Sequence, residues 1–358
     1  MKPKIIFTGG HHNSALVVAL ELKKQGFEII WLGHKFTMRG DKQVSAEFQE
    51  VTANGIAFFE LKAGKVYHKH SPLEFFKVIF GFCQALVYLL KLRPKLIIAF
   101  GGYLSVPVVL AGWLLRIPSV THEQTVTAGW ANKAIAPFVK KILLTHQSSR
   151  INYPHDKAVV VGLPLRKGLM AKHKFKKAKP PLIYITCGKQ GSHVINQAVF
   201  PIIPHLVEKF KVAHQTGSHT LTIDQERARR VKVGLPKSLR HRYLHKSYFF
   251  EKDAVRYLKL ASVVVSRAGA HTAYELLYLG KRSVVIPIPW VSHNEQGQNA
   301  ALLARHNPTV ILEESRLSSE TLLDSIYQAL RLPVSAVRQK VVTDATARMI
   351  KQLRPFLR

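Results

Sequence analysis

The residues from Ser266 to Glu275 carry the clearest chemical pattern in this sequence. They follow an apolar run, Val263–Val265, and lead into a helical pattern of leucines. A strand that turns at Gly269 into a helix presents free backbone N–H groups and the positive end of the helix dipole, which bind anions. Glu275 lies about one and a half turns into that helix, where its carboxylate can accept hydrogen bonds from hydroxyls. The pattern predicts a site for a phosphate-bearing ligand with hydroxyls; a tight turn with a surface glutamate is the alternative.

Four more glycine-rich turns follow strand-like runs. One such turn is weak evidence, but five turns divided between the two halves of the chain predict a cleft lined by helix N-termini and backbone donors. Arg166, Lys189 and Arg267 are cations that can stabilise a diphosphate there. No D-x-D, G-x-G-x-x-G or P-loop motif occurs, which argues against a metal clamped by aspartates and against a dinucleotide site. The four turns are Thr8–Asn13, Gly101–Ser105, Gly162–Arg166 and Cys187–Gly191.

Two histidine-containing segments can supply acid–base chemistry. His122 and Glu123 close a predicted strand, Ser119–Thr121, so an imidazole and a carboxylate meet at its exit. A capping glutamate beside a structural histidine is the alternative. His11 and His12 adjoin the first glycine turn, where one of them can act as a general base. Adjacent residues diverge in direction and no third ligand has suitable spacing, so no metal site is expected.

The composition is that of a strongly basic globular protein. Hydrophobic residues make up 47% of the chain, and 358 residues allow two domains of ordinary size. Lysine and arginine number 53 against 21 aspartates and glutamates, and the net charge of +32 favours nucleic acid, anionic lipid or a phosphorylated substrate as partner. Two cysteines cannot form a disulfide framework and fit a reducing compartment.

Short β-branched runs alternate with helical patterns along both halves of the chain. This alternation predicts parallel sheets with helices on both faces. A basic, proline-ended segment, 167–181, predicts a linker. We therefore expect an α/β fold of two doubly wound domains facing each other across a cleft, with ligands at the carboxyl ends of the strands. The expected domains are 1–165 and 166–339, with a C-terminal helix at about 340–358 packing back on the first.

The helical segment 73–92 is apolar on nearly all sides. Its run Val78–Leu90 would span roughly 20 Å as a helix, less than the ~30 Å hydrocarbon core, so no transmembrane helix is expected. The segment is either a helix packed in the core or one that attaches the basic protein to an anionic membrane surface. The side chains expected to contact a membrane are Phe75, Phe76, Ile79, Phe80 and Phe82.

Motifs in order along almost the whole chain resemble those of the MurG family of peptidoglycan glycosyltransferases. They include Thr8-Gly-Gly-His11, Gly101-Gly-Tyr-Leu-Ser105, His122-Glu-Gln124, Gly162 with Pro164 and Arg166, Gly188 with Gln190-Gly191, His214-Gln215, Ser266-Arg-Ala-Gly-Ala270, Glu275, and Gln296 with Asn299. The resemblance implies the GT-B fold and inverting transfer of N-acetylglucosamine (GlcNAc) from UDP-GlcNAc to undecaprenyl-diphosphate-MurNAc-pentapeptide. It also implies a peripheral enzyme at the cytoplasmic face of the cell membrane, working in peptidoglycan synthesis, cell shape and cell division.

The resemblance implies a donor site in the second domain. Glu275 would bind the UDP ribose, and Arg166 with the turn Gly188–Gly191 would bind the diphosphate. Gln296 and Asn299 would bind the hydroxyls of the sugar. No tightly bound cofactor is expected, and donor binding should require no metal. The remaining donor residues by this resemblance are Lys189, Gln190, Phe250, Arg267, Gly269, Ala270 and Thr272.

The first domain would hold the acceptor. His11 and Glu123 would face the acceptor hydroxyl, with one of them as the base that removes its proton. The remaining acceptor residues by this resemblance are Thr8, Gly9, Gly10, His12, Asn13, Gly102, Tyr103, Thr125 and Asn132.

The sequence departs from the family pattern mainly on the acceptor side. Ile6 and Phe7 stand in place of two glycines, Ser14 in place of a proline and Thr125 in place of an asparagine. These departures bear on the acceptor and leave the donor chemistry unchanged, so a UDP-sugar transferase acting on another lipid or lipid-linked glycan is the alternative. A non-enzymatic nucleic-acid-binding protein is suggested only by the charge, and no nucleic-acid recognition motif is present.

Overall fold

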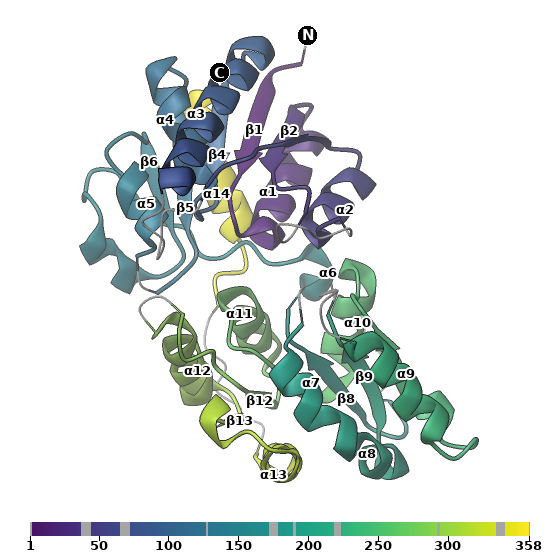
Figure 1. Ribbon diagram of the computed structural model, residues 1–358. Coiled ribbons are helices and arrows are strands. Elements are labelled where there is room, and N and C mark those ends of the chain that lie inside the picture. The colour runs from purple at the N-terminus through teal and green to yellow at the C-terminus, as the bar shows by residue number, and fades with distance from the viewer. Residues whose placement is uncertain are drawn as a thin grey trace. The chain divides into compact units, whose positions relative to one another are not determined.

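The computed structural model describes residues 2–36, 44–64, 72–126, 128–171, 178–188, 191–217, 223–291, 294–333 and 341–357, without the side chains of 72–75. The predicted residues Lys189 and Gln190, and the side chain of Phe75, therefore lie outside the described part. The chain divides into two compact units, one formed by Met1–Leu165 with Val342–Arg358 and one by Arg166–Val341. Each unit has one parallel sheet covered by helices, which confirms the predicted α/β class (Figure 1).

Seven parallel strands among the described residues form the sheet of the first unit, in the order β3-β2-β1-β4-β5-β6-β7. The order reverses between β1 and β4, so the turns that follow these two strands meet at the switch point where open α/β sheets bind ligands. The strands are β1 Lys4–Thr8, β2 Glu28–Gly33, β3 Ala57–Glu60, β4 Leu96–Ala99, β5 Ser119–Glu123, β6 Lys141–Leu144 and β7 Ala158–Val160.

Two helix layers cover this sheet, as β-branched strands buried on both faces require. One layer contains α1 (His12–Lys24) and α14 (Ala345–Leu353), and the other contains α3 (Pro72–Leu92), α4 (Ser105–Leu114) and α5 (Trp130–Ile135). α2 (Ala46–Ala53) contributes Val51 to the first layer's core. Figure 1 shows α14, drawn in yellow, beside α1, although the two helices are far apart in sequence.

Ile6 and Phe7, two of the departures from the family pattern, lie inside this core. Both are fully buried, and they point to opposite faces of the sheet. The Phe7 ring stacks between Trp31 on β2 and Phe100 after β4, with ring centroids 5.8 and 6.1 Å away. These two replacements therefore change the packing of β1 and present no side chain to a ligand at the surface.

Six parallel strands among the described residues form the second sheet, in the order β10-β9-β8-β11-β12-β13. Its switch point lies between β8 and β11, and the Gly188 and Gly269 turns follow these two strands. The strands are β8 Leu182–Thr186, β9 Lys211–Gln215, β10 Tyr243–Lys246, β11 Ala261–Ser266, β12 Ser283–Val285 and β13 Thr309–Ile311.

Helices also cover both faces of the second sheet. One face carries α7 (His193–Val199), α8 (Ile203–Lys209) and α13 (Ser319–Arg331), and the other carries α6 (Lys167–Met170), α10 (Glu251–Leu260), α11 (Ala270–Leu279) and α12 (Glu295–His306). α9 (Asp224–Gly234) packs beside β10. The segment 167–181, predicted as a linker, begins with α6. Leu169 of this helix is buried in the hydrophobic core of the second unit, so the start of the segment belongs to that unit.

Candidate functional site

Two glycine turns follow β8 and β11 at the switch point of the second sheet, and Gly188 in the first of them is exposed. Gly188 and Gly191 both have φ of +78°, which favours glycine, and a Cβ added to Gly191 would lie 2.1 Å from the carbonyl oxygen of Thr216. A Cβ added to Gly188 or to Gly269 would instead meet no described atom within 4 Å. Gly191 is therefore packed tightly against Thr216, which directly follows β9. The space beside Gly188 and Gly269 is open to a ligand.

Glu275 is buried in α11, behind the Gly269 turn, with only 2% of its surface exposed. Its Oε1 atom lies 3.5 Å from Nε of Arg166 and 3.2 Å from Nδ1 of His271, one helical turn earlier. Burial alone would raise the pKa of Glu275, but the Arg166 guanidinium and His271 together hold that pKa below its usual value. Glu275 is therefore an ionised carboxylate within an ionic cluster.

Three buried polar side-chain atoms at the end of β11, in α11 and in α12 have no hydrogen-bond partner among the described residues. They are Oγ of Ser266, the hydroxyl of Tyr274 and Oδ1 of Asn299. The amide nitrogen of Asn299 is engaged, because it donates to the carbonyl of Ala268 at 3.1 Å. Since nearly all buried polar groups in proteins are paired, each of these three atoms is a candidate for contact with a polar ligand.

Arg267 joins the two turns of the switch point. Its guanidinium donates to Oγ of Ser192 at 2.7 Å and to the carbonyl of Ile286 at 3.2 Å, and it forms an ion pair with Glu314. Ser192 immediately precedes α7, so this side chain connects the β8 turn to the β11 turn. Arg267 thus has three partners among the described residues, and its most direct effect is on the shape of the site.

The other predicted donor residues occupy the same edge of the second sheet. Gln296 accepts a hydrogen bond from the backbone N–H of Ile288 at 3.0 Å, which fixes the start of α12. The carbonyl of Gly188 accepts from Gln215 at 2.7 Å. Ala270 and Thr272 lie in the first turn of α11, and Phe250 immediately precedes α10 with its side chain exposed.

At the switch point of the first sheet, two glycine turns pack backbone against backbone. The N–H of Gly10 donates to the carbonyl of Gly101 at 2.9 Å, and the N–H of His11 donates to Phe100 at 3.3 Å. A Cβ on Gly9 would lie 2.6 Å from the Gly101 carbonyl oxygen, and one on Gly102 would lie 2.9 Å from the Gly10 nitrogen. These N–H groups hold the turns together.

Both carboxylate oxygens of Glu123 accept several hydrogen bonds from described residues. Oε1 accepts from the N–H and the hydroxyl of Thr125 at 3.0 and 2.8 Å. Oε2 accepts from the N–H of Gly129 at 2.8 Å, the amide of Asn132 at 3.0 Å and the hydroxyl of Tyr153 at 2.6 Å. Burial would raise the pKa of Glu123, but these donors, led by Tyr153, lower it. The carboxylate anchors the loop between β5 and α5.

The three histidines near this edge differ in their surroundings. His11 is half-buried and lies against Gly101, where an added Cβ would be 3.4 Å from its ring and 3.3 Å from the Asn132 amide. His12 is buried, and its Nε2 lies 2.5 Å from the Glu50 carboxylate. His122 is buried beside the carbonyl of Gly162 at 3.1 Å, and burial lowers its pKa to about 4. Of the three, His11 is the most accessible for proton transfer.

The remaining predicted acceptor residues are divided between the core and the surface. Thr8 and Thr125 are buried, Asn13, Gly102 and Tyr103 are half-buried, and Ser14 donates to the side chain of Gln124 at 3.1 Å. No group of three or more His, Cys, Asp or Glu side chains suited to a metal ion occurs among the described residues.

Helix α3 has one buried and one exposed face. Ala85 and Leu89 are buried in the core, and Gly81 lies so close to Ala63 that an added Cβ would be 2.7 Å from the Ala63 methyl. Phe82 is half-buried against the same core. Among the helices that the structure describes, none has the length and hydropathy needed to cross a bilayer. The exposed apolar residues of α3 form a stripe of Phe76, Ile79, Phe80, Val87 and Leu90.

Sequence reasoning missed the partners that fix these side chains. Tyr153 is 30 positions from Glu123, and Glu314 and Arg267 are also far apart, so no local spacing reveals either pair. His271 is the exception, because it precedes Glu275 by four positions and therefore shares its helix face.

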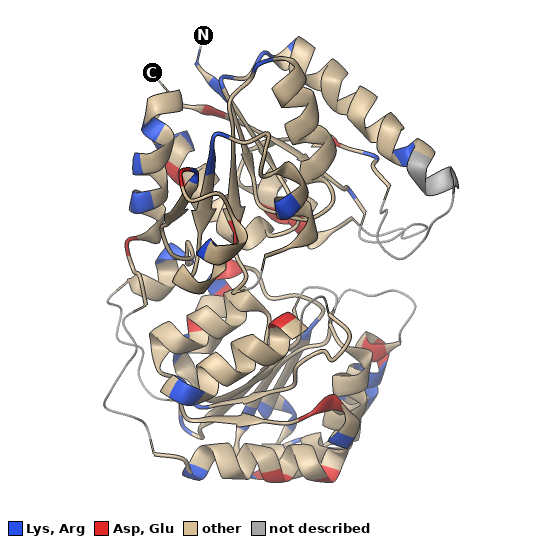
Figure 2. Ribbon diagram, turned by 90° about the vertical axis from the view of Figure 1, so that its left-hand side faces the viewer, with Lys and Arg blue, Asp and Glu red and all other residues tan. Residues whose placement is uncertain are grey.

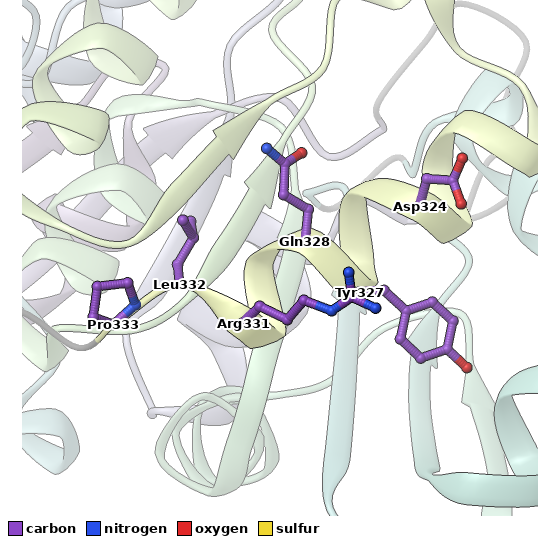
Figure 3. A pocket seen from close by; sticks show the side chains of 6 residues that line it. All are labelled: Asp324, Tyr327, Gln328, Arg331, Leu332 and Pro333. Atoms are coloured by element: carbon purple, nitrogen blue, oxygen red, sulfur yellow. The ribbon is translucent and has the colours of Figure 1, made fainter.

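A separate pocket of about 460 Å³ lies away from this site (Figure 3). It is formed by the end of α13, and the carbonyl of Leu332 there accepts from Arg282, which directly precedes β12. The pocket thus lies toward the amino ends of the strands, and the residues above lie at their carboxyl ends. Its lining residues are Asp324, Tyr327, Gln328, Arg331, Leu332 and Pro333.

Comparisons with known proteins place the chain in a family. Residues 5–144 match the glycosyltransferase family 28 N-terminal domain, and residues 182–352 match the family 28 C-terminal domain. A Clostridium botulinum protein is 31% identical, with 90% of each chain covered, and a Legionella pneumophila protein is 27% identical, with 98% and 97% covered. Both are named UDP-N-acetylglucosamine--N-acetylmuramyl-(pentapeptide) pyrophosphoryl-undecaprenol N-acetylglucosamine transferase.

Solved structures share the fold over the full chain. Acinetobacter baumannii MurG has a TM-score of 0.65 at 23% identity, with 99% of each chain covered. The UDP-GlcNAc 2-epimerase from Neisseria meningitidis, bound to UDP-GlcNAc, has a TM-score of 0.64 at 14% identity, with 99% and 100% covered. The two family 28 domains and the full-length similarity lead to one conclusion: the chain belongs to the MurG family of glycosyltransferases.

Proposed function

We propose that this protein is an inverting N-acetylglucosaminyltransferase that moves GlcNAc from UDP-GlcNAc to polyprenyl-diphosphate-linked MurNAc-pentapeptide. The observation that carries the proposal is the 31% identity to a transferase of that name over 90% of the chain. The buried, ionised Glu275 behind an open glycine turn supports it, because this arrangement suits a nucleoside diphosphate.

The donor binds at the switch point of the second sheet. Glu275 accepts hydrogen bonds from the ribose hydroxyls, and Arg166 pairs with the diphosphate, whose oxygens also meet backbone N–H groups at the Gly188 turn. Gln296 and Asn299 on α12 contact the sugar. As UDP leaves, these cationic and N–H groups stabilise the charge that develops on it.

His11 is the base, and Glu123 positions the loop around it. The acceptor oxygen bonds to the anomeric carbon on the face opposite UDP while its proton passes to an imidazole nitrogen of His11. The bond from that carbon to the phosphate oxygen breaks, and UDP takes the electron pair. Glu123 is a poor base because both its oxygens accept hydrogen bonds and its pKa is lowered.

The exposed stripe on α3 attaches the protein to the cytoplasmic face of the membrane. Figure 2 shows α3 as a long helix with almost no charged residues between its ends, and its last turn carries Lys91. Phe76 is 68% exposed and Phe80 57%, so both can insert into a bilayer surface. Basic side chains beside anionic lipid each add about 1 kcal/mol, screened by salt.

The membrane assignment is tested by sedimentation with vesicles of anionic lipid. The double variant Phe76→Ser, Phe80→Ser should bind vesicles more weakly and keep the wild-type melting temperature, since both side chains are exposed. Ala85→Ser, on the buried face of the same helix, is the matched control and should lower the melting temperature instead. Unchanged vesicle binding by the double variant would leave only the basic surface as an anchor.

The function itself is tested by transfer of radiolabelled GlcNAc from UDP-GlcNAc to candidate lipids, with mass spectrometry of the product. We expect the label on the MurNAc-pentapeptide lipid. Transfer only to another lipid or lipid-linked glycan would support the alternative acceptor. The variant His11→Ala should lower kcat by about 10²–10⁴-fold, the usual contribution of a general base, with UDP affinity unchanged. A wild-type rate in that variant would exclude His11 as the base.

A further inference from the structure

One buried amide side chain joins the Gly188 turn to the core of the second unit. Gln215 is the last residue of β9, and only 3% of its surface is exposed. Its Nε2 donates to the carbonyl of Gly188 at 2.7 Å, and its Oε1 accepts from the backbone N–H of Phe249 at 2.9 Å. We propose that Gln215 is a positioning residue for the donor, because it fixes Gly188 where the diphosphate would bind. The inference rests on the proposed donor site.

The Phe249 end of this link is held firmly by packing. Its side chain is 1% exposed, and its ring lies against Tyr184 and Tyr257, with ring centroids 6.0 and 4.9 Å away. The two residues that follow Gln215 also form backbone hydrogen bonds of 3.0 Å with the last residue of β10 and the residue after it. The oxygen of the Gln215 amide is therefore bonded to a backbone group that the core keeps in place.

The Gly188 end of the link is exposed and has no side chain to pack. Gly188 has φ of +78°, and a Cβ added to it would meet no described atom within 4 Å. Its carbonyl also accepts from the N–H of Gly191, but at 3.4 Å. Because glycine can adopt many backbone conformations, the shorter bond from Gln215 is the stronger constraint on the conformation of Gly188.

This constraint favours binding of a diphosphate at the turn. Backbone donors that are already arranged for an anion lose less free energy to ordering when the anion binds. Both partners of the Gln215 amide belong to the protein, so its bonds order Gly188 independently of the donor. Gln215 thus acts on donor affinity through the backbone of Gly188 and makes no contact with the donor itself.

A second buried polar side chain in the same sheet provides a matched control. Ser283 is fully buried, and its Oγ forms a hydrogen bond of 2.9 Å with the hydroxyl of Thr309. Ser283 is the first residue of β12, whereas Gln215 is the last residue of β9, and all the strands are parallel. The two side chains therefore lie at opposite edges of the sheet, and only Gln215 adjoins the proposed donor site.

Calorimetric titration with UDP tests the inference. Gln215→Met keeps the length of the side chain but removes both hydrogen bonds, so the affinity for UDP should fall by about tenfold. Ser283→Ala should lower the melting temperature and leave the affinity for UDP unchanged. In the transfer assay, Gln215→Met should raise KM for UDP-GlcNAc by a similar factor and leave KM for the lipid acceptor unchanged, which a general loss of stability would not do.

The possible outcomes separate the inference from the proposed function. If folded Gln215→Met binds UDP as tightly as the wild type, or if both KM values rise equally, Gln215 does not position the donor site and the inference is wrong. Failure of the wild type to bind UDP would instead contradict the proposed donor site.

A thermal melt shows whether Gln215→Met is folded. If it is not, Gln215→Asn provides the same test, because it keeps the amide but is one methylene too short to reach both backbone groups. The affinity of Gln215→Asn for UDP should also fall, and an affinity equal to that of the wild type would overturn the inference.

Discussion

Glu123 and Glu275 are both nearly inaccessible to solvent, at 1% and 2% exposure, yet their carboxylates have opposite surroundings. Five hydrogen bonds from described backbone and side-chain groups fill both oxygens of Glu123. Glu275 instead has, among the described residues, two ion-pair neighbours, Arg166 and His271, close to a single oxygen. The two carboxylates belong to different units: Glu123 is the last residue of β5, and Glu275 lies in α11, the helix that follows β11.

The burial of a carboxylate therefore does not indicate its role; the groups that surround it do. Two backbone and three side-chain donors, all neutral, hydrogen-bond both oxygens of Glu123, and a ligand would have to break these bonds to use the carboxylate. The charged side chain of Arg166 can exchange one anion for another, so Glu275 can accept a ligand. These surroundings show Glu123 as an anchor of its loop, and they support the binding role that the proposed function gives to Glu275.

The largest expected effect is on stability when Glu123 is removed. Glu123→Ala removes the carboxylate that accepts hydrogen bonds from Thr125, Gly129, Asn132 and Tyr153, and each buried donor that finds no other acceptor costs about 1–3 kcal/mol. Because the loop can relax, we expect the unfolding free energy of the first unit to fall by about 4 kcal/mol. Urea denaturation measures it. Tyr153→Phe, which removes one donor, should cost about 1 kcal/mol, and equal losses in the two variants would contradict the anchoring role.

The next effect is on donor affinity when Glu275 is removed. Glu275→Ala should weaken UDP binding by about 1.5–3 kcal/mol, the usual value for hydrogen bonds to a charged group. Its loss of stability should be smaller than that of Glu123→Ala, because the Arg166 side chain already reaches solvent in part. Calorimetry with UDP and a melt of the same sample measure both quantities. Wild-type affinity for UDP would show that Glu275 does not bind the ribose.

The sequence predicts the class of fold and the strand-to-helix turns well, because alternating elements and glycine spacing are local signals. The position of Glu275, in the helix after the Gly269 turn, follows from the same local signal. The anchoring of Glu123 does not, since Tyr153 reaches it through the fold alone. The sequence also presents α3 as apolar on nearly all sides. The structure reveals an inner face because Gly81 and Ala85 are small enough to pack closely on the core.

A smaller effect involves one buried histidine in each unit. Burial lowers the pKa of His122 from 6.5 to about 4, and that of His214 from 6.5 to about 3. Below pH 6.5 the unfolded chain binds protons that the folded chain does not, so this stability is complete above pH 6.5 and is lost as the pH falls. The loss should be about 2 kcal/mol for each histidine at pH 5.

Variants test this titration separately in the two units. His122→Gln and His214→Gln keep a polar side chain and cannot titrate, so each should flatten the decline of melting temperature between pH 7 and pH 5 for its own unit. The pH dependence of the melting temperature should be similar in the two units, whereas Glu123 and Glu275 differ in their surroundings. A decline as steep as that of the wild type in both variants would exclude these histidines as its source.

The last prediction is that a chelator does not change the affinity for UDP-GlcNAc. If Glu275 acts as a ribose acceptor and Arg166 as the partner of the diphosphate, then UDP-GlcNAc binding depends on charges that the chain itself supplies. EDTA should therefore leave the affinity for UDP-GlcNAc unchanged, and added Mg²⁺ or Mn²⁺ should not raise it. Loss of binding in EDTA with recovery on adding either metal would mean that a carboxylate at this edge serves as a metal ligand. Glu275 would then be the first candidate, and its contrast with Glu123 would lie in metal binding and not in the exchange of ion-pair partners.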